Sequence, residues 1–433
     1  MSDLHPSSQD VTCSTVWDTA GRIGIGRAVA SRIRRTVRSA RSLDVRSVLR
    51  RAGSGAALTH AVARLLPERG RDPADLPLTD YKAVNYWLGY RFGFVRRGLP
   101  GEILRRVVGG PPTYRHVAVT AVGLSRAAVL SVVPMALQAA RRAPRGQPRV
   151  AAAGLLLLSP LTCSLLRHDV GRYDAVGVLV LALLAAARPV WLRLRLPVGV
   201  SLLAAAVGVA AATEEFLFAV VAPTAVAAVT LLTGGRGLDL KRRVLLLGGV
   251  LAPGAAVAGA SLLTPAPRAA LLAARHDGTR AGVGPADDVM GDSLTALDRG
   301  LVDNLAFFRL FEPAAVVLSL GLWSGVYAAT TTVLGRLIGA STAVRYRWLV
   351  AVHAGIGAAL CAVAADFRRW WGLALLGLVA TVALLEPDQS TQPATPMAIM
   401  YAVVLTLAGL GLNDMRVYPG GRLRTDRALP STL

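Results

Sequence analysis

Ionisable side chains that could carry chemistry occur in short groups, mostly where an apolar run of the sequence begins or ends. The residues that could act as catalytic acids or bases are Asp80, His168, Asp169, Glu214 and Glu215. The residues that could bind a substrate are Tyr90, Arg96, Arg97, Arg172, Asp174, Asp366 and Arg369. A carboxylate can take a proton from a hydroxyl group, and arginine binds phosphate through paired hydrogen bonds. The pattern therefore suits a reaction in which a hydroxyl attacks and a phosphate leaves.

The stretch RHDVGRYD, residues 167–174, is dense in exchangeable groups for a short connection between two apolar runs. Its His168 and Asp169 could form an acid–base pair or a metal-binding pair, and Arg172 could hold an anion. The alternative is an interfacial loop with local ion pairs. Both interpretations stay open at this stage, and so does the use of a divalent cation as a cofactor.

Glu214 and Glu215 interrupt the apolar run AAAVGVAAATEEFLFAVVAP with almost no loop around them. Ionisable groups at the ends of membrane spans are costly, and they usually face the protein interior or a water-filled cavity. We weigh a tight turn whose acids face water against a pair that lines a cavity, and favour the second. In ADFRRWWG, residues 365–372, Asp366 could pair with Arg368 or Arg369 at the mouth of the cavity.

The composition indicates an α-helical protein with many membrane spans. Of the 433 residues, 53% are hydrophobic and only 17% are charged, which is too little charge to cover the surface of a soluble protein of this length. About eleven apolar runs could span a membrane, although the first is only about 16 residues long where a span usually needs about 20. The runs lie near residues 52–67, 116–140, 150–166, 174–190, 196–212, 215–233, 244–263, 313–338, 346–365, 370–385 and 396–412.

The basic residues indicate how these runs are oriented. The net charge is +22, and the arginines stand in clusters between apolar runs, so membrane topology explains them better than nucleic-acid binding. Arginine-rich loops stay on the cytoplasmic side, and four of them alternate along the chain on one side. We therefore predict a basic cytoplasmic tail (1–51), a membrane domain (52–412) with external loops 80–115 and 264–312, and a C-terminal tail (413–433).

The stretch DYKAVNYWLGYRFGFVRRGLPGEILRR, which begins at Asp80, combines aromatic and basic residues. Aromatic rings at the depth of the lipid headgroups and arginines that reach phosphates are typical of a segment that lies along a membrane surface. LPGEILRRVV, residues 99–108, predicts a short amphipathic helix with Pro100 near its first turn. Gly98 before Pro100 predicts a shaped loop whose backbone approaches another group closely.

The order of these features resembles that of the C-type (GT-C) membrane glycosyltransferases, over roughly residues 52–220. The resemblance implies many spans, a catalytic carboxylate in the first external loop, juxtamembrane helices after it, and sugars drawn from polyprenyl-phosphate carriers. Asp80 matches the position of the first-loop carboxylate. His168 and Asp169 match a further acidic or basic site in the second external loop.

We therefore predict a glycosyltransferase of the plasma membrane that moves a sugar from a polyprenyl-phosphate carrier to a cell-envelope acceptor on the extracytoplasmic face. Its partners would be a lipid-linked sugar donor, a glycan or lipid acceptor and membrane lipids, with no nucleic acid. One alternative is a transporter or flippase with a charged outward cavity, and another is a non-catalytic membrane assembly protein. A transporter needs ionisable groups near the middle of the membrane, and His353 is the main one within the predicted spans.

Overall fold

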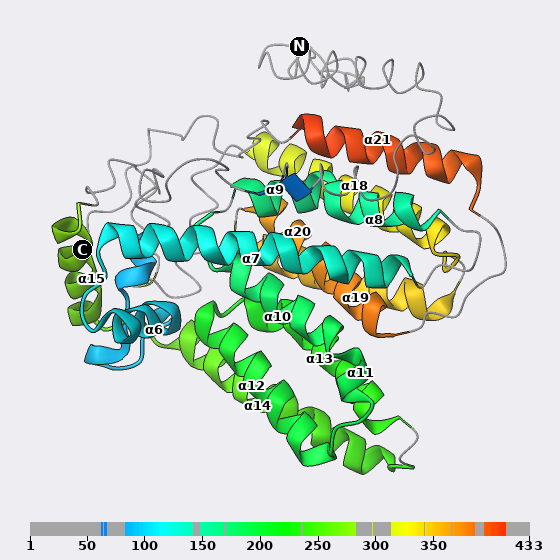
Figure 1. The fold of residues 1–433 in the computed structure, drawn as a ribbon. Helices are drawn as coiled ribbons and strands as arrows, with labels where there is room; N and C mark the ends of the chain where they lie inside the picture. Colours follow the sequence, from blue (N-terminus) through cyan, green and yellow to red (C-terminus); the bar gives the residue numbers. More distant parts are fainter. Residues whose placement is uncertain are drawn as a thin grey trace, which may run out of the picture. The chain divides into compact units, whose positions relative to one another are not determined.

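Helices make up all the regular secondary structure in the part of the chain that the structure describes (Figure 1). The structure is a computed structural model, and it describes residues 62–63, 65–66, 83–141, 148–168, 170–234, 237–282, 297, 313–341, 343–364, 366–385 and 394–412. These residues belong to one unit, Ser54–Leu433. The predicted all-α class is confirmed. The predicted tails 1–51 and 413–433 lie outside the described residues.

The elements follow one another with short connections over most of the described chain. In order they are η2 (Val84–Trp87), η3 (Tyr90–Phe92), α6 (Gly98–Val108), α7 (Tyr114–Ala140), α8 (Arg149–Leu158), α9 (Pro160–His168), α10 (Asp174–Ala186), α11 (Arg188–Trp191), α12 (Leu196–Thr213), α13 (Leu217–Thr233), α14 (Leu240–Leu263), α15 (Arg268–Arg280), α18 (Pro313–Leu337), α19 (Val344–Val363), α20 (Phe367–Leu384) and α21 (Pro396–Leu412). Of the two predicted external loops, 80–115 thus contains η2, η3 and α6, and 264–312 contains α15.

Within the described residues, six helices are long and apolar enough to cross a membrane, namely α7, α12, α14, α18, α19 and α20. The count rises to seven if α8 and α9, which meet at 47° around Ser159, form one broken span. The chain is therefore a multi-pass membrane protein, but the predicted number of about eleven spans is wrong. α10 has 13 residues and α13 has 17, whereas a span needs about 20. Counting apolar runs in the sequence overestimates the number of spans, because an apolar helix packed inside the protein need not reach across the bilayer.

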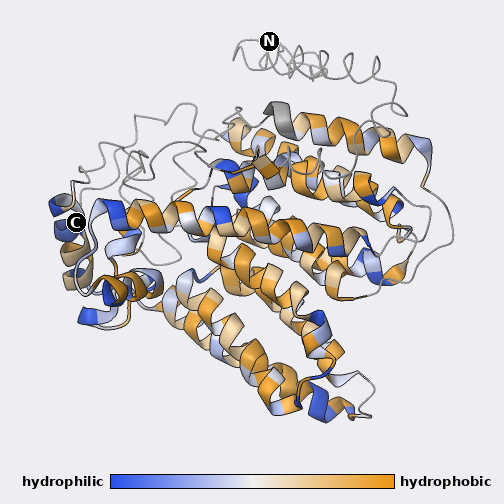
Figure 2. Cartoon of the chain, viewed as in Figure 1, coloured by the Kyte–Doolittle hydropathy of each residue, from blue (hydrophilic) through white to orange (hydrophobic). Residues whose placement is uncertain are grey.

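Helix α20 forms the centre of the bundle and packs against α7, α9, α10, α13, α18 and α19 (Figure 1). The 18-residue apolar stretch of α20 is entirely buried inside the protein, whereas only 22% of a stretch of the same length in α14 is buried. Small residues allow this close packing. A Cβ atom at Gly377 would lie 2.9 Å from the ring of His353 on α19 and 3.2 Å from the carbonyl oxygen of Val220 on α13. Figure 2 shows that the long helices are mostly apolar and that hydrophilic residues collect at their ends.

The segment that contains η2, η3 and α6, here called the juxtamembrane segment, packs on a second apolar cluster. In this cluster η2, α6 and α15 meet the start of α7 and the turn before α10. The helix predicted over residues 99–108 is confirmed as α6. The close approach is also confirmed, but its tightest point is Gly101, where a Cβ atom would lie 2.0 Å from the carbonyl oxygen of Leu88. The indole of Trp87 donates a hydrogen bond of 2.8 Å to the carbonyl of Pro112. These contacts fix the segment against the end of the bundle where the charged residues collect.

Candidate functional site

Glu214 and Glu215 form the turn between α12 and α13. Glu214 is extended, with φ −155° and ψ 126°, and its carbonyl accepts a hydrogen bond from the backbone N–H of Leu217, which closes the turn. Both glutamates are only 3% exposed. The tight turn was expected, but an interpretation in which both acids face water is wrong, because the ends of neighbouring elements cover them.

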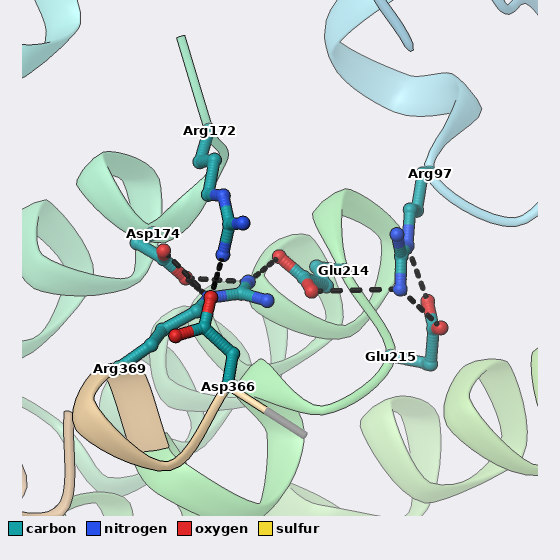
Figure 3. A network of polar contacts seen from close by, with 7 residues as sticks. All are labelled: Arg97, Arg172, Asp174, Glu214, Glu215, Asp366 and Arg369. Carbon is teal, nitrogen blue, oxygen red and sulfur yellow. Dashed lines mark hydrogen bonds and ion pairs between the residues drawn. The ribbon is translucent and has the colours of Figure 1, made fainter. Parts of the chain in front are cut away.

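Arg369, in the first turn of α20, joins one of these glutamates to α10. Its Nη2 lies 2.6 Å from Oδ1 of Asp174 and 2.5 Å from Oε2 of Glu214, and its Nε lies 2.7 Å from Oδ2 of Asp174 (Figure 3). Asp174 is the first residue of α10, where the partial positive charge of a helix N-terminus favours a carboxylate. Beside Asp174 is a small cavity, lined also by Ser125 and Leu165, with room for about one water molecule.

Arg97 joins the juxtamembrane segment to the same turn. Its Nη2 lies 2.9 Å and its Nε 3.3 Å from the two carboxylate oxygens of Glu215, and Nη2 is 3.5 Å from Oε1 of Glu214 (Figure 3). Arg97 precedes α6 and adopts a left-handed conformation, with φ 63° and ψ 11°. Among the described residues it is the only one other than glycine with a positive φ. Such a backbone costs about 1–3 kcal/mol and persists where surrounding contacts hold it.

Asp366 and Arg172 complete the network as an ion pair between the residue before α20 and the turn before α10 (Figure 3). Asp366 therefore does not form the ion pair that we expected with Arg368 or Arg369. Instead, its partner comes from RHDVGRYD, almost two hundred residues earlier in the chain.

The network holds three arginines and four carboxylates, which leaves one net negative charge. Burial by itself raises the pKa of Glu214, but the charges of Arg369 and Arg97 outweigh it and hold that pKa below its usual value. The pKa of Asp366 is also lowered: burial raises it, but Arg172 and Arg369 outweigh that effect. Both groups are therefore charged at neutral pH. Replacing a buried ion network by apolar side chains is often neutral or stabilising, so stability does not explain these seven side chains.

Two tyrosines next to the network were not among the predicted site residues. Tyr173 stands between Arg172 and Asp174 in the sequence, and its ring packs edge-on against that of Tyr86 in η2, with 5.1 Å between ring centroids. Neither hydroxyl has a hydrogen-bond partner among the described residues. No sequence signal separated the two from interfacial aromatic residues, because their relation to the charged groups exists only in three dimensions.

The other predicted site residues lie outside the network or outside the described residues. Tyr90 stacks on Phe94, with ring centroids 6.2 Å apart. Arg96, which directly precedes Arg97, is buried at 5% exposure. His168 is the last residue of α9, and the structure does not describe its side chain. Asp80 and Asp169 lie outside the described residues, so their predicted roles stay predictions.

Among the described residues, no three His, Cys, Asp or Glu side chains come together in a way that could hold a metal ion. The predicted metal-binding pair, His168 and Asp169, falls where the structure gives no side chains. The use of a divalent cation therefore stays a prediction from the sequence.

Comparisons of the chain with protein-family models, with curated proteins and with solved structures find no match. The likeness to C-type glycosyltransferases therefore stays a resemblance in the order of spans, acids and aromatic residues. What the structure establishes is a multi-pass helical membrane protein in which charged side chains from four separate stretches of the chain meet in one buried network.

Proposed function

We propose that the protein is a membrane glycosyltransferase that moves a sugar from a polyprenyl-phosphate carrier to a cell-envelope acceptor on the extracytoplasmic face. The observation that carries this proposal is the buried network of Arg97, Arg172, Arg369 and their four carboxylate partners at one end of the apolar helices. Ionisable groups in membrane proteins are expensive and usually mark a substrate path or a reaction site.

The reaction needs both kinds of charge that the network supplies. The acceptor hydroxyl attacks the anomeric carbon, the bond from that carbon to the phosphate oxygen breaks, and the hydroxyl proton passes to a carboxylate. The leaving phosphate changes from a diester to a monoester and gains negative charge, which cations must stabilise. We assign the base to Asp80, at the start of the juxtamembrane segment, and the phosphate contacts to arginines of the network.

Arg97 and Arg172 are the arginines that an entering phosphate can reach. Their side chains are 16% and 15% exposed, compared with 8% for Arg369. Since both form ion pairs with carboxylates, a phosphate must displace a carboxylate from one of them. Arg369 stays with Asp174 and Glu214 in this scheme and positions the turn that carries Glu215, the partner of Arg97.

The juxtamembrane segment gives the lipid carrier a route to Arg97. Phe92 and Phe94 are about 40% exposed, at 42% and 41%, and on α6 Ile103 and Val107 are 52% and 78% exposed. Apolar side chains of this kind beside arginines suit the boundary between lipid headgroups and acyl chains. A polyprenyl chain could therefore stay in the bilayer while its phosphate reaches Arg97, which directly precedes α6.

The test is a transfer assay on the full chain, purified and reconstituted in lipid nanodiscs. Polyprenyl-phosphate hexoses labelled in the sugar are incubated with the protein and envelope lipid or glycan acceptors, and labelled product is measured. We expect transfer by the wild type and a large loss in Arg97→Ala. The control is Glu102→Gln, which removes the ion pair with the exposed Arg106 on α6 and keeps an oxygen that can accept from the backbone N–H of Tyr90. Absence of transfer from every donor, with a folded wild type, would count against an enzyme.

A transporter is the second candidate, because of the break between α8 and α9. The two helices meet at 47° around Ser159, and Ser159 and Thr162 are fully buried there. Broken helices often line substrate sites in transporters. Flux of labelled lipid-linked sugar across proteoliposome membranes, without any transfer product, would support this candidate over the enzyme.

A further inference from the structure

Several buried polar atoms lack hydrogen-bond partners among the described residues, and three of them are the hydroxyls of Tyr86 and Tyr173 and Oε1 of Glu214. The exposures of these residues are 0%, 3% and 3%. A buried hydroxyl that makes no hydrogen bond destabilises the folded protein, because it has lost its bonds to water without replacement. Polar atoms of this kind are rare in proteins, and binding sites are one place where they occur.

The three atoms belong to one region of the molecule. The rings of Tyr86 and Tyr173 are in contact, with centroids 5.1 Å apart. Tyr173 is flanked in sequence by two residues of the charged network. Burial raises the pKa of its hydroxyl, and the charge of Arg97 lowers that pKa while the charge of Glu214 raises it. Oε1 of Glu214 lies 3.5 Å from Nη2 of Arg97 (Figure 3). The tyrosines therefore lie where the apolar cluster under the juxtamembrane segment meets the network.

The chemistry of this region favours a neutral ligand with several hydroxyl groups. Three arginines against four carboxylates leave one net negative charge, so beside Oε1 of Glu214 a neutral group is favoured over any anion in addition to the donor phosphate. A carboxylate oxygen accepts hydrogen bonds, whereas a phenol hydroxyl can donate one and accept others. Aromatic rings add apolar surface that packs against a ligand. A sugar ring presents both hydroxyls and C–H faces, and so it matches the set.

We infer that Tyr86, Tyr173 and Glu214 bind the hydroxyl groups of the sugar and thereby select the sugar on the lipid-linked donor. This inference rests on the proposed function. Arg97 lies 3.5 Å from Oε1 of Glu214, and it directly precedes α6, the helix proposed to lie against the lipid. A phosphate held by Arg97 and a sugar held by the tyrosines would therefore be neighbours. In a glycosyl phosphate the two groups are joined at the anomeric carbon, which would then lie between them.

Tyrosine-to-phenylalanine substitutions remove the hydroxyls and keep the rings. The variants are Tyr86→Phe and Tyr173→Phe, and the matched control is Tyr346→Phe. Tyr346 is equally buried, but its hydroxyl donates a hydrogen bond of 2.6 Å to the carbonyl of Thr331, and it lies in the first turn of α19, at the opposite end of that helix from Asp366 of the network. Binding of a polyprenyl-phosphate hexose, of the same polyprenyl phosphate without sugar, and of a methyl hexoside is measured on the full chain in nanodiscs.

We expect each of the two site variants to weaken binding of the polyprenyl-phosphate hexose about 3- to 10-fold, as befits one lost hydrogen bond. Binding of the sugar-free lipid should not change. The melting temperature of the unliganded site variants should stay the same or rise, because no protein hydrogen bond is lost, whereas Tyr346→Phe should melt earlier and bind normally. Wild-type affinity for both lipids in the site variants would mean that the hydroxyls bind water only, and the inference would be wrong while the proposed function stands.

Equal weakening of both lipids would also overturn it, since the tyrosines would then shape the site without recognising the sugar. If the wild type binds no polyprenyl-phosphate hexose but binds the methyl hexoside through both tyrosines, the proposed function fails and the sugar site stands. If the wild type binds neither probe, both proposals fail.

Discussion

Arg369→Met removes the cation that contacts both Asp174 and Glu214, and it is expected to destabilise the protein strongly. Asp174 and Glu214 have side chains that are 3% exposed and lie 2.6 and 2.5 Å from Nη2 of Arg369. Breaking such a buried pair from one side typically costs about 3–5 kcal/mol, because the remaining charge has no compensation. The control is Arg106→Met on α6, whose side chain is 79% exposed in its pair with Glu102, and exposed pairs contribute about 0.2–1 kcal/mol.

The assay is unfolding of the full chain in detergent, followed by tryptophan fluorescence, for both variants and for Arg369→Met combined with Asp174→Asn and Glu214→Gln. The combined variant should recover much of the lost stability, because no unpaired charge remains.

The pH dependence of the free energy of unfolding is a second test. Because the folded pKa of Glu214 is lowered below its usual 4.5, its contribution is present above that pH and is lost as pH falls through the folded value.

In Arg369→Met, burial of Glu214 is no longer outweighed by that arginine, so its pKa rises. The difference in stability between wild type and variant should therefore be largest at pH 7 and should shrink toward pH 4. A cost below about 1 kcal/mol at pH 7, equal to that of the surface control, would refute the buried network.

Three further outcomes are expected. Asp80→Asn should reduce sugar transfer about 10²–10⁴-fold, the usual effect of losing a general base, with an unchanged melting temperature; a folded variant with normal transfer would exclude Asp80 as the base. Arg97→Ala and Arg97→Gly should both raise KM for the lipid-linked donor before kcat falls, but the glycine variant should melt later, because glycine adopts the left-handed backbone without strain; normal KM in both variants would remove Arg97 from phosphate binding. Single cysteines at Asp239 and Thr264, which flank α14, should be labelled from the cytoplasmic and the external side respectively, and labelling from one side only would show that α14 does not span.

The sequence was sufficient to predict the helical membrane class and the turn at Glu214. The apolar runs and their interruption by two acids can each be recognised within a short stretch of sequence, and they do not depend on which helices become neighbours. The pairings were not predictable in the same way. Arg369 bonds to Asp174 and Glu214 because α20 packs against both α10 and α13. No local pattern encodes which helices become neighbours.

The predicted number of spans was wrong for a related reason. A run of Ala, Val and Leu has the same hydropathy whether it faces lipid or other helices, so α10 looked like a span although it has 13 residues and a mostly buried surface. Tyr86 and Tyr173 were missed because an aromatic residue near a membrane end has an ordinary interfacial explanation. What distinguishes them is their contact with each other and the nearness of Tyr173 to Glu214.

The central position of α20 has a consequence for how the protein is assembled in the cell. Helices α7, α9, α10 and α13 leave the ribosome before α20, yet they pack against it. Until residue 384 is synthesised and inserted, the helices that will surround α20 have no central partner, and Asp174 and Glu214 lack the arginine that neutralises them. A helix made late in synthesis thus both fills the interior and delivers the last positive charge of the network. Chains truncated after α19 should remain open to quality-control proteases, and co-expression of the missing C-terminal piece should rescue them.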